Sequence, residues 1–144
     1  MKDSTLKNIS LTKMKIINLE KGDVLHYLKN SSTNFNGFGE VYFSKIKPNV
    51  IKAWKLHKMM TLNLIVPMGK VRFVFFSETT NAFRIEEIGE ENYKRLSVPP
   101  GIWFGFKGLS NKISLIANFA DIEHDPNESM NKNINEINFD WNNL

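Results

Sequence analysis

Short runs of apolar and aromatic residues follow one another along most of this chain, and turn-forming residues separate them. The runs with strand character occupy residues 50–57, 61–66, 70–76, 93–98, 102–106 and 114–119. Gly69 and Gly101 stand where the backbone must bend sharply, and Pro99 and Pro100 fit only outside a central hydrogen-bonded ladder. Many short strands with closely spaced turns are typical of an antiparallel sandwich or barrel. The sequence therefore predicts an all-β fold.

The segments between and before these runs are less regular. Residues 23–28 and 40–44 are also strand-like, because apolar and aromatic side chains recur there between turn signals. Residues 77–92 are polar and contain the acidic stretch 86–91. We interpret 77–92 as an excursion from the sheets with one helical turn.

The chain has the size of one compact domain, with 144 residues and 42% hydrophobic content. Its tail is rich in Asn, but Ile137, Phe139 and Trp141 recur on it, which favours docking over a free tail. We therefore expect a single domain over 1–144. Its N-terminal strands (about 13–30) and C-terminal tail (about 125–144) are expected to dock on the barrel.

Cysteine is absent from the chain, which excludes disulfides, iron–sulfur clusters and thiol catalysis and fits a reducing compartment. No run approaches the roughly 18 consecutive apolar residues of a membrane span. The first residues lack the apolar core and the small-residue cleavage site of a signal peptide. These features predict a cytoplasmic protein that has no membrane partner.

The net charge of +4 is unevenly distributed along the chain. Residues 41–77 hold seven Lys and Arg and no acid, whereas residues 78–144 hold eleven acids and six bases. The basic half is either a solvated face or the mouth of a pocket that attracts an anion such as a nucleotide diphosphate. It lacks the helix-turn-helix, finger and RNP patterns of nucleic-acid-binding domains, so we expect no nucleic-acid partner.

A histidine strand, a Gly turn and a Pro-Pro-Gly turn into an aromatic strand follow one another at 51–57, 66–71 and 98–106. This order resembles the cupin fold, an antiparallel β-barrel of the jelly-roll type. Metal cupins carry a His-x-His pair, a Glu and a later His, but here Lys55 and Phe104 stand at two of these positions. One imidazole cannot make a three- or four-ligand site. We expect no metal and no cofactor.

Four motifs narrow the resemblance to the metal-free dTDP-4-dehydrorhamnose 3,5-epimerase family. Residues 52–57 (Lys-Ala-Trp-Lys-Leu-His) take the place of the family's Arg-Gly-Leu-His, and 68–71 (Met-Gly-Lys-Val) resemble its Arg-Gly-Glu-Val. Residues 98–101 (Val-Pro-Pro-Gly) resemble its Ile-Pro-Glu-Gly, and 137–140 (Ile-Asn-Phe-Asp) its Ile-Arg-Trp-Asp. The four motifs stand in the family's order over most of the chain.

The resemblance implies a reaction and two catalytic residues. It makes His57 the base that removes a proton from the carbon next to a 4-keto group, and Asp140 the carboxylate that orients it. A carboxylate on one imidazole nitrogen fixes the tautomer and makes the other nitrogen more basic. On the sequence alone, without the resemblance, the favoured interpretation is a hydrogen-bonded core histidine and a surface acid.

Five further residues are substrate-binding candidates. Lys55 lies two residues before His57 on a strand, so both side chains share a face and the lysine can hold an oxyanion or phosphate. The other candidates are Lys52 and Arg72 for a diphosphate, Trp54 for stacking and Tyr42 for a hydroxyl. Each has a structural alternative, as a solvated cation or a packed aromatic.

Two family residues are missing from their expected places. The strand after His57 carries no lysine within 60–64, and the run 114–119 carries no tyrosine to return a proton on the opposite face. We expect a nucleotide-sugar epimerase or isomerase that acts on a 4-keto-6-deoxy sugar nucleotide in surface polysaccharide biosynthesis. The alternative is a non-catalytic sugar-nucleotide or carbohydrate-binding cupin; a lyase or isomerase with one base is a third possibility. We also expect a homodimer, partly from the resemblance and partly because 23–28 is a plausible exposed edge.

Overall fold

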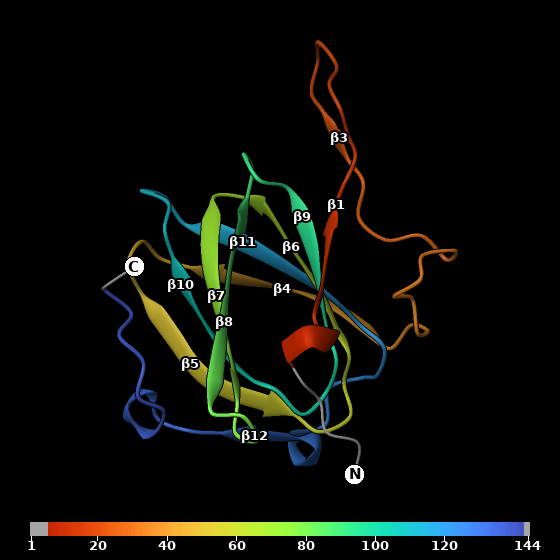
Figure 1. Ribbon diagram of the computed structural model, residues 1–144. Helices are drawn as coiled ribbons and strands as arrows, with labels where there is room; N and C mark the ends of the chain where they lie inside the picture. The colour runs from red at the N-terminus through yellow and green to blue at the C-terminus, as the bar shows by residue number, and fades with distance from the viewer. Residues whose placement is uncertain (1–5, 143–144) are drawn as a thin grey trace.

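Two five-stranded antiparallel sheets face each other in the computed structural model, which describes residues 6–142 (Figure 1). The first sheet has the order β1-β9-β6-β11-β4, with β1 at Ser10–Lys13, β4 at Glu40–Ile46, β6 at Leu62–Met68, β9 at Lys94–Val98 and β11 at Ser114–Ala120. The second has the order β12-β5-β10-β7-β8, with β5 at Ile51–His57, β7 at Lys70–Ser77, β8 at Ala82–Gly89, β10 at Trp103–Gly108 and β12 at Ser129–Asn131. The predicted antiparallel jelly-roll sandwich is confirmed.

The main core lies between the two sheets because alternate side chains of each strand point to one face. Val71, Phe73 and Phe75 of β7 are fully buried on this inner face, and Leu64 and Val66 of β6 meet them from the first sheet. The outward residues of β7 instead join a second cluster on the outside of the second sheet. The second sheet is therefore covered on both faces.

The segment 77–92 differs from its expected form: it contains strand β8 in place of a helical turn. β8 pairs with β7 along its whole length, from Ala82 to Gly89. Its charged residues have partners: Glu87 accepts a hydrogen bond from Arg72 Nε of β7 at 2.7 Å, and Arg84 forms an ion pair with Glu86. Edge strands in general carry charges, which makes the polarity of this segment compatible with a strand.

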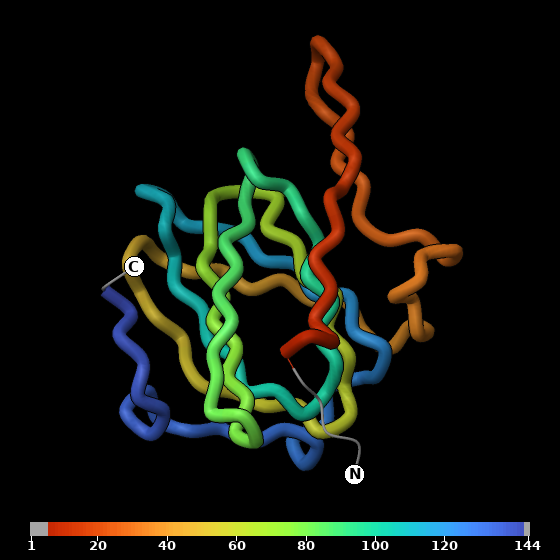
Figure 2. Tube along the Cα trace, in the orientation of Figure 1, coloured from red at the N-terminus to blue at the C-terminus, as the bar shows by residue number. Residues whose placement is uncertain are grey.

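An N-terminal hairpin, which we call the arm, projects from the barrel (Figures 1 and 2). It is formed by β2 (Ile16–Ile17) and β3 (Val24–Leu25), and only these two residues of the run 23–28 form a strand. Its base is tied to the first sheet, where Tyr93 Oη donates to His26 O at 2.7 Å and Arg95 donates to Tyr27 O at 2.7 Å. The expected edge strand is thus part of a hairpin outside the barrel sheets.

The C-terminal segment follows the outside of the second sheet. It passes through the short turns η2 (Pro126–Glu128) and η3 (Ile134–Glu136), with β12 between them; a third short turn, η1 (Leu6–Asn8), lies near the other end. Backbone hydrogen bonds of 3.0 Å in both directions join Trp54 to Lys132, and Ile137 and Trp141 pack into the outer cluster. This path carries η2 and β12 directly alongside β5. None of the helical turns within residues 6–142 is long or apolar enough to cross a membrane.

Candidate active site

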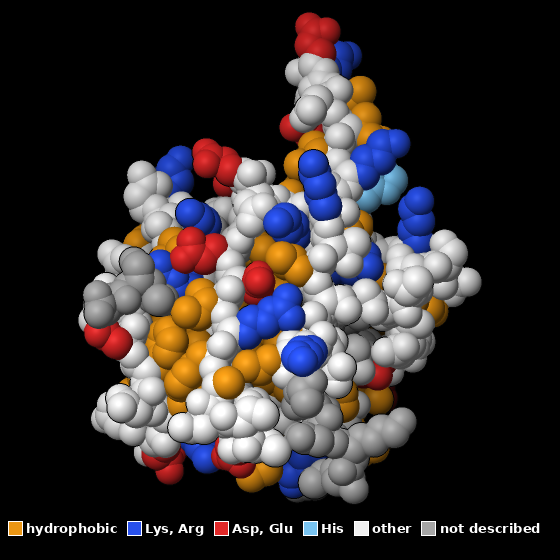
Figure 3. Space-filling model, viewed as in Figure 1, with side chains coloured by type: hydrophobic (Ala, Val, Ile, Leu, Met, Phe, Trp, Pro, Cys, Tyr) orange, Lys and Arg blue, Asp and Glu red, His pale blue; other side chains and the backbone are white. Residues whose placement is uncertain are grey.

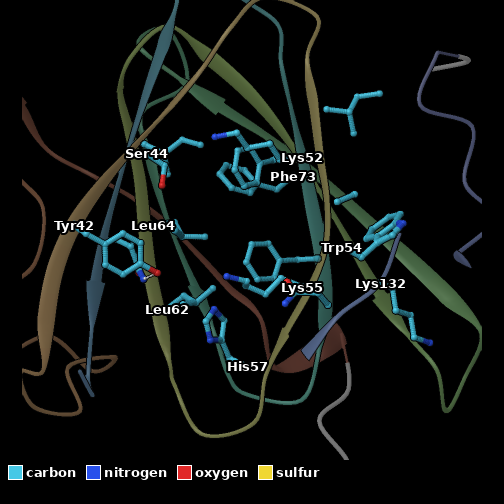
Figure 4. A pocket seen from close by; sticks show the side chains of 17 residues that line it. Tyr42, Ser44, Lys52, Trp54, Lys55, His57, Leu62, Leu64, Phe73 and Lys132 are labelled. Atoms are coloured by element: carbon cyan, nitrogen blue, oxygen red, sulfur yellow. Dashed lines mark hydrogen bonds between the residues drawn. The ribbon is translucent and has the colours of Figure 1, made fainter. Parts of the chain in front are cut away.

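A cavity of about 510 Å³ opens between the two sheets (Figure 4). Its floor is apolar, with Leu62 and Leu64 of β6 and Phe73 of β7 among its residues. The polar side chains on its wall come from both sheets: Tyr42, Ser44 and Asn118 from the first, and Lys52, Lys55, His57, Asn131 and Lys132 from the second and the segment that follows β12. An apolar cavity with a few convergent polar groups is typical of a small-molecule site.

His57 stands on the cavity wall with Glu128 behind it. The imidazole is 5% exposed and the carboxylate residue 4%, and His57 Nδ1 is hydrogen-bonded to Glu128 Oε1. The second oxygen of Glu128 accepts from the backbone N–H groups of Met59 at 3.2 Å and Met60 at 3.3 Å. Both carboxylate oxygens are therefore held, and the carboxylate in turn fixes the histidine ring.

The surroundings of Glu128 favour its ionised form. Burial by itself would raise the pKa of Glu128, but the hydrogen bonds from His57 and from the two backbone N–H groups, with the charge of a protonated His57, bring it below its ordinary value. An ionised carboxylate only accepts, so Nδ1 of a neutral His57 carries the proton and Nε2 keeps its lone pair. Phe104 stacks on the ring at 6.0 Å between centroids. The imidazole thus lines the cavity with its Nδ1 held by Glu128 and, when neutral, with the lone pair on Nε2.

The structure corrects the expected partner of His57. Asp140 is exposed, and its Oδ1 accepts from the backbone N–H of Asn142 at 3.0 Å. It lies on the outer side of the second sheet because its neighbours Phe139 and Trp141 pack into the outer cluster. The acid that reaches His57 is Glu128.

Sequence reasoning missed Glu128 because its position depends on pairing between distant segments. Strand β12 pairs with β5 in a register that sets Ser129 opposite His57, so the preceding residue arrives next to the imidazole. The local signal is weak: Asp125 caps η2 by accepting from Asn127 N, and a three-residue strand follows. Nothing in that pattern identifies which strand it joins.

The three lysines that border the cavity differ in their interaction partners. Lys55 lines the cavity together with His57, and within residues 6–142 it forms no ion pair. Lys52 also borders the cavity and donates to Lys45 O at 3.2 Å. Lys132 is bound to Glu78 at 2.7 Å and lies 4.8 Å from the Trp103 ring centre. Lys55 is therefore the cation best placed to meet an anion in the cavity.

Two predicted binding residues point away from the cavity. Arg72 alternates with the inward Val71 and Phe73, and it is engaged by Glu87 on the outer face. Trp54 borders the cavity but is 2% exposed, and its ring lies 5.3 Å from Trp141 in the outer cluster. Figure 4 shows the indole on the far side of its strand from His57. The structure does not bring these two side chains to the site.

Tyr42 reaches the cavity from the first sheet, on the wall opposite His57 (Figure 4). Its hydroxyl oxygen accepts a hydrogen bond of 2.9 Å from Asn118 Nδ2 on the neighbouring strand β11. Burial raises the pKa of Tyr42 above its ordinary value, and the hydrogen bond from Asn118 opposes this only in part. The phenol is therefore protonated at neutral pH.

No cluster of three or more His, Cys, Asp or Glu side chains suited to hold a metal ion occurs among residues 6–142. The apolar cavity thus brings together the buried imidazole of His57 with the Glu128 carboxylate, the Tyr42 phenol and the Lys55 ammonium group. Such a set supports proton transfer to and from a bound anionic ligand.

Comparison with known proteins identifies the family. The chain is 34% identical to a dTDP sugar isomerase from Desulfovibrio desulfuricans, with a TM-score of 0.89 over 96% of this chain and 93% of that one. It is 25% identical to the spore coat polysaccharide biosynthesis protein SpsL of Bacillus subtilis, over 85% of this chain and 87% of the relative.

A more distant neighbour shares the fold. The dTDP-6-deoxy-D-glucose-3,5-epimerase RmlC from Legionella pneumophila, in complex with dTDP-4-keto-L-rhamnose, is 17% identical, with a TM-score of 0.82 over 97% of this chain and 81% of that one. No family model matches the chain. The resemblance seen in the four motifs is confirmed by these likenesses. The chain belongs to the family of the dTDP-4-dehydrorhamnose 3,5-epimerases and the related dTDP-sugar isomerases.

Proposed function

We propose that this protein is an epimerase or isomerase that acts on a 4-keto-6-deoxy sugar nucleotide. In this proposal His57 is the base that removes a proton from the carbon next to the keto group, and Glu128 is its positioning residue. The observation that carries the proposal is the buried His57–Glu128 pair on the wall of an apolar cavity. A buried histidine serving only the core would not need to face such a cavity.

The chemistry follows from the arrangement of the pair. Removal of the proton leaves an imidazolium, and the ionised Glu128 next to Nδ1 stabilises that charge. The 4-keto group acidifies the neighbouring C–H bond because the electrons of that bond can move onto the carbonyl oxygen. The proposed reaction therefore requires neither a metal nor an organic cofactor.

Binding of the nucleotide part rests on charge at the cavity mouth. Lys55 and Lys52 border the cavity, and Lys55 stands two residues before the proposed base. Ammonium groups that border the same cavity as the proposed base suit the diphosphate of a sugar nucleotide. The neighbour that holds dTDP-4-keto-L-rhamnose has the same fold, which supports a dTDP-linked substrate.

The proposed process is the synthesis of a surface polysaccharide or glycoconjugate. The support is the similarity to SpsL of Bacillus subtilis, a spore coat polysaccharide biosynthesis protein. We place the step in the cytoplasm, in keeping with a chain that contains no cysteine.

We further propose that the protein acts as a homodimer. The arm stands clear of the barrel in Figure 3 and carries exposed apolar side chains, with Leu19 at 55% and Val24 at 46% exposed. The outer side of edge strand β4 is also apolar, with Phe43 at 65% and Val41 at 42% exposed. A second copy would cover both surfaces, and light scattering at micromolar concentration should give twice the chain mass of 16.7 kDa.

The test of the function is solvent deuterium exchange. The wild-type protein, incubated with dTDP-4-keto-6-deoxyglucose in D₂O, should incorporate deuterium next to the keto group, as followed by NMR or mass spectrometry. His57→Asn keeps much of the side-chain volume but removes the base, so exchange should fall at least ~100-fold. Wild-type protein that binds dTDP yet exchanges no proton of any 4-keto sugar nucleotide would point to a binding cupin instead.

A further inference from the structure

The side-chain amide of Asn118 can take one orientation only. Its Oδ1 accepts from the backbone N–H of Asn63 at 3.0 Å, and a backbone N–H cannot act as an acceptor. The amide NH₂ group must therefore face the other way, toward Tyr42 Oη at 2.9 Å and the sulfur of Met60 at 3.9 Å. Asn118 is 2% exposed and Asn63 3%, so neither hydrogen bond competes freely with bulk solvent.

This orientation decides where the Tyr42 proton points. Since Asn118 donates to the hydroxyl oxygen, the O–H bond of Tyr42 must be directed away from Asn118. Within residues 6–142 the hydroxyl has no other hydrogen-bond partner, and the side chain lines the cavity. The phenol therefore presents a proton to the cavity.

The two walls then carry complementary groups. Tyr42 and Asn118 are directly opposite each other on β4 and β11 of the first sheet, while His57 comes from β5 of the second. Figure 4 shows Tyr42 and His57 reaching into the same cavity from different strands. A ligand between them meets a proton acceptor on one side and a proton donor on the other.

We infer that Asn118 positions the hydroxyl of Tyr42 so that it donates a hydrogen bond to the keto oxygen of the substrate while His57 removes the neighbouring proton. This inference rests on the proposed function. The C–H electrons form the C=C bond of an enolate, the carbonyl π electrons move to oxygen, and the proton resides on His57 Nε2. Tyr42 keeps its own proton and stabilises the oxygen's negative charge; the high pKa that burial confers on this phenol suits a donor that is not itself consumed.

The amide-to-acid change at Asn118 tests the direction of this hydrogen bond. In Asn118→Asp, an ionised carboxylate still accepts from Asn63 N–H with one oxygen, but its other oxygen accepts from Tyr42. The phenol proton is then turned out of the cavity. At pH 8, kcat for exchange in dTDP-4-keto-6-deoxyglucose should fall about 100-fold, the lower end of the effect of removing one oxyanion donor. The affinity for dTDP should stay within about twofold.

Tyr42→Phe removes the same donor directly and should cause the same loss. The double variant Asn118→Asp/Tyr42→Phe should have the same kcat as either single variant, because both changes remove the same hydrogen bond to the substrate. Tyr93→Phe is the control: it also removes a tyrosine hydroxyl that makes one hydrogen bond, but this hydroxyl lies outside the cavity and donates to His26 O at 2.7 Å. Its exchange rate should equal that of the wild type. If Asn118→Asp does not fold, the comparison of Tyr42→Phe with Tyr93→Phe decides the question.

Three results would overturn the inference. Tyr42→Phe with wild-type kcat would remove the donor from the mechanism, and Asn118→Asp with wild-type kcat would remove its positioning. If Tyr42→Phe exchanges deuterium at the wild-type rate but no longer forms product, the phenol would instead be the acid that returns a proton to the carbon. Each of these is distinct from failure of the proposed function, in which the wild type itself shows no exchange or His57→Asn retains it.

Discussion

The two faces of the second sheet use similar side chains for different ends. On the inner face, Lys55 has no ion-pair partner among residues 6–142 and His57 lines an open cavity. On the outer face, Arg72 forms an ion pair with Glu87, and Trp54 and Trp103 are buried against residues of the C-terminal segment. The inner face of the sheet thus carries the polar residues of the cavity, and the outer face carries residues that stabilise the fold. Alternation produces most of this division, because each second residue faces the other side. On β5 a register shift against β10, which leaves Trp54 without a paired residue, lets both Lys52 and Lys55 border the cavity.

The largest expected effect belongs to the outer face and concerns stability. Trp141 is 4% exposed and contacts Trp54 and Phe139, with ring centres 5.3 and 5.1 Å away. Trp141→Ala should lower the free energy of unfolding by about 3 kcal/mol or more, measured by urea denaturation, because it leaves a large void. A change below about 1 kcal/mol would show that the tail contributes little to the fold.

The next comparison sets the two candidate acids against each other. Glu128→Gln puts an NH₂ group near either the His57 Nδ1–H or the backbone N–H groups of Met59 and Met60, so one donor loses its acceptor. Its exchange activity should fall about 100-fold, an effect of the size attributed to a positioned base. Asp140→Asn is the matched control and should retain wild-type activity, because Asp140 is exposed and its carboxylate accepts a hydrogen bond from Asn142 of the tail. The reverse outcome would restore Asp140 as the partner of His57.

A smaller effect is expected for binding of the nucleotide. Lys55→Ala should weaken the affinity for dTDP about tenfold, since it removes a cation of the cavity wall that has no ion-pair partner among residues 6–142. Arg72→Ala removes a cation of the outer face and should leave that affinity unchanged. Isothermal titration of both variants with dTDP measures the difference, and equal losses would mean that the two faces are not separated as described.

The smallest effect concerns the pH dependence of stability. The pKa of Glu128 is lower in the folded chain than its ordinary value of 4.5, so its ionised form favours folding. This contribution is complete above pH 4.5 and is lost as the pH falls through the lower folded pKa. The difference in urea midpoint between wild type and Glu128→Gln should therefore shrink below pH 4.5. A difference that grows in acid would contradict the assigned ionisation state.

The local sequence pattern was enough to predict the all-β fold of this protein and to single out His57 as a candidate site residue. The strands 70–76 and 102–106 were predictable because apolar alternation and Gly or Pro turns are properties of neighbouring residues. The four motifs, one of which contains His57, are likewise local and indicated the family. β8 was missed because its polar sequence is held by pairing with β7, including the Arg72–Glu87 ion pair, and the local pattern of 77–92 does not reveal that strand partner.

Only the tertiary structure decided which groups meet in the cavity. Glu128 reaches His57 across 71 positions of the chain, and Asn118 reaches Tyr42 across 76. Both contacts depend on strand pairing and register, which shift a side chain to the other face when they change by one residue. Asp140 matched the motif but lies outside, because the packing of Phe139 and Trp141 sets the tail on the outer face. Residue type and spacing therefore indicate the proposed base, while the carboxylate hydrogen-bonded to it follows from how distant strands are paired.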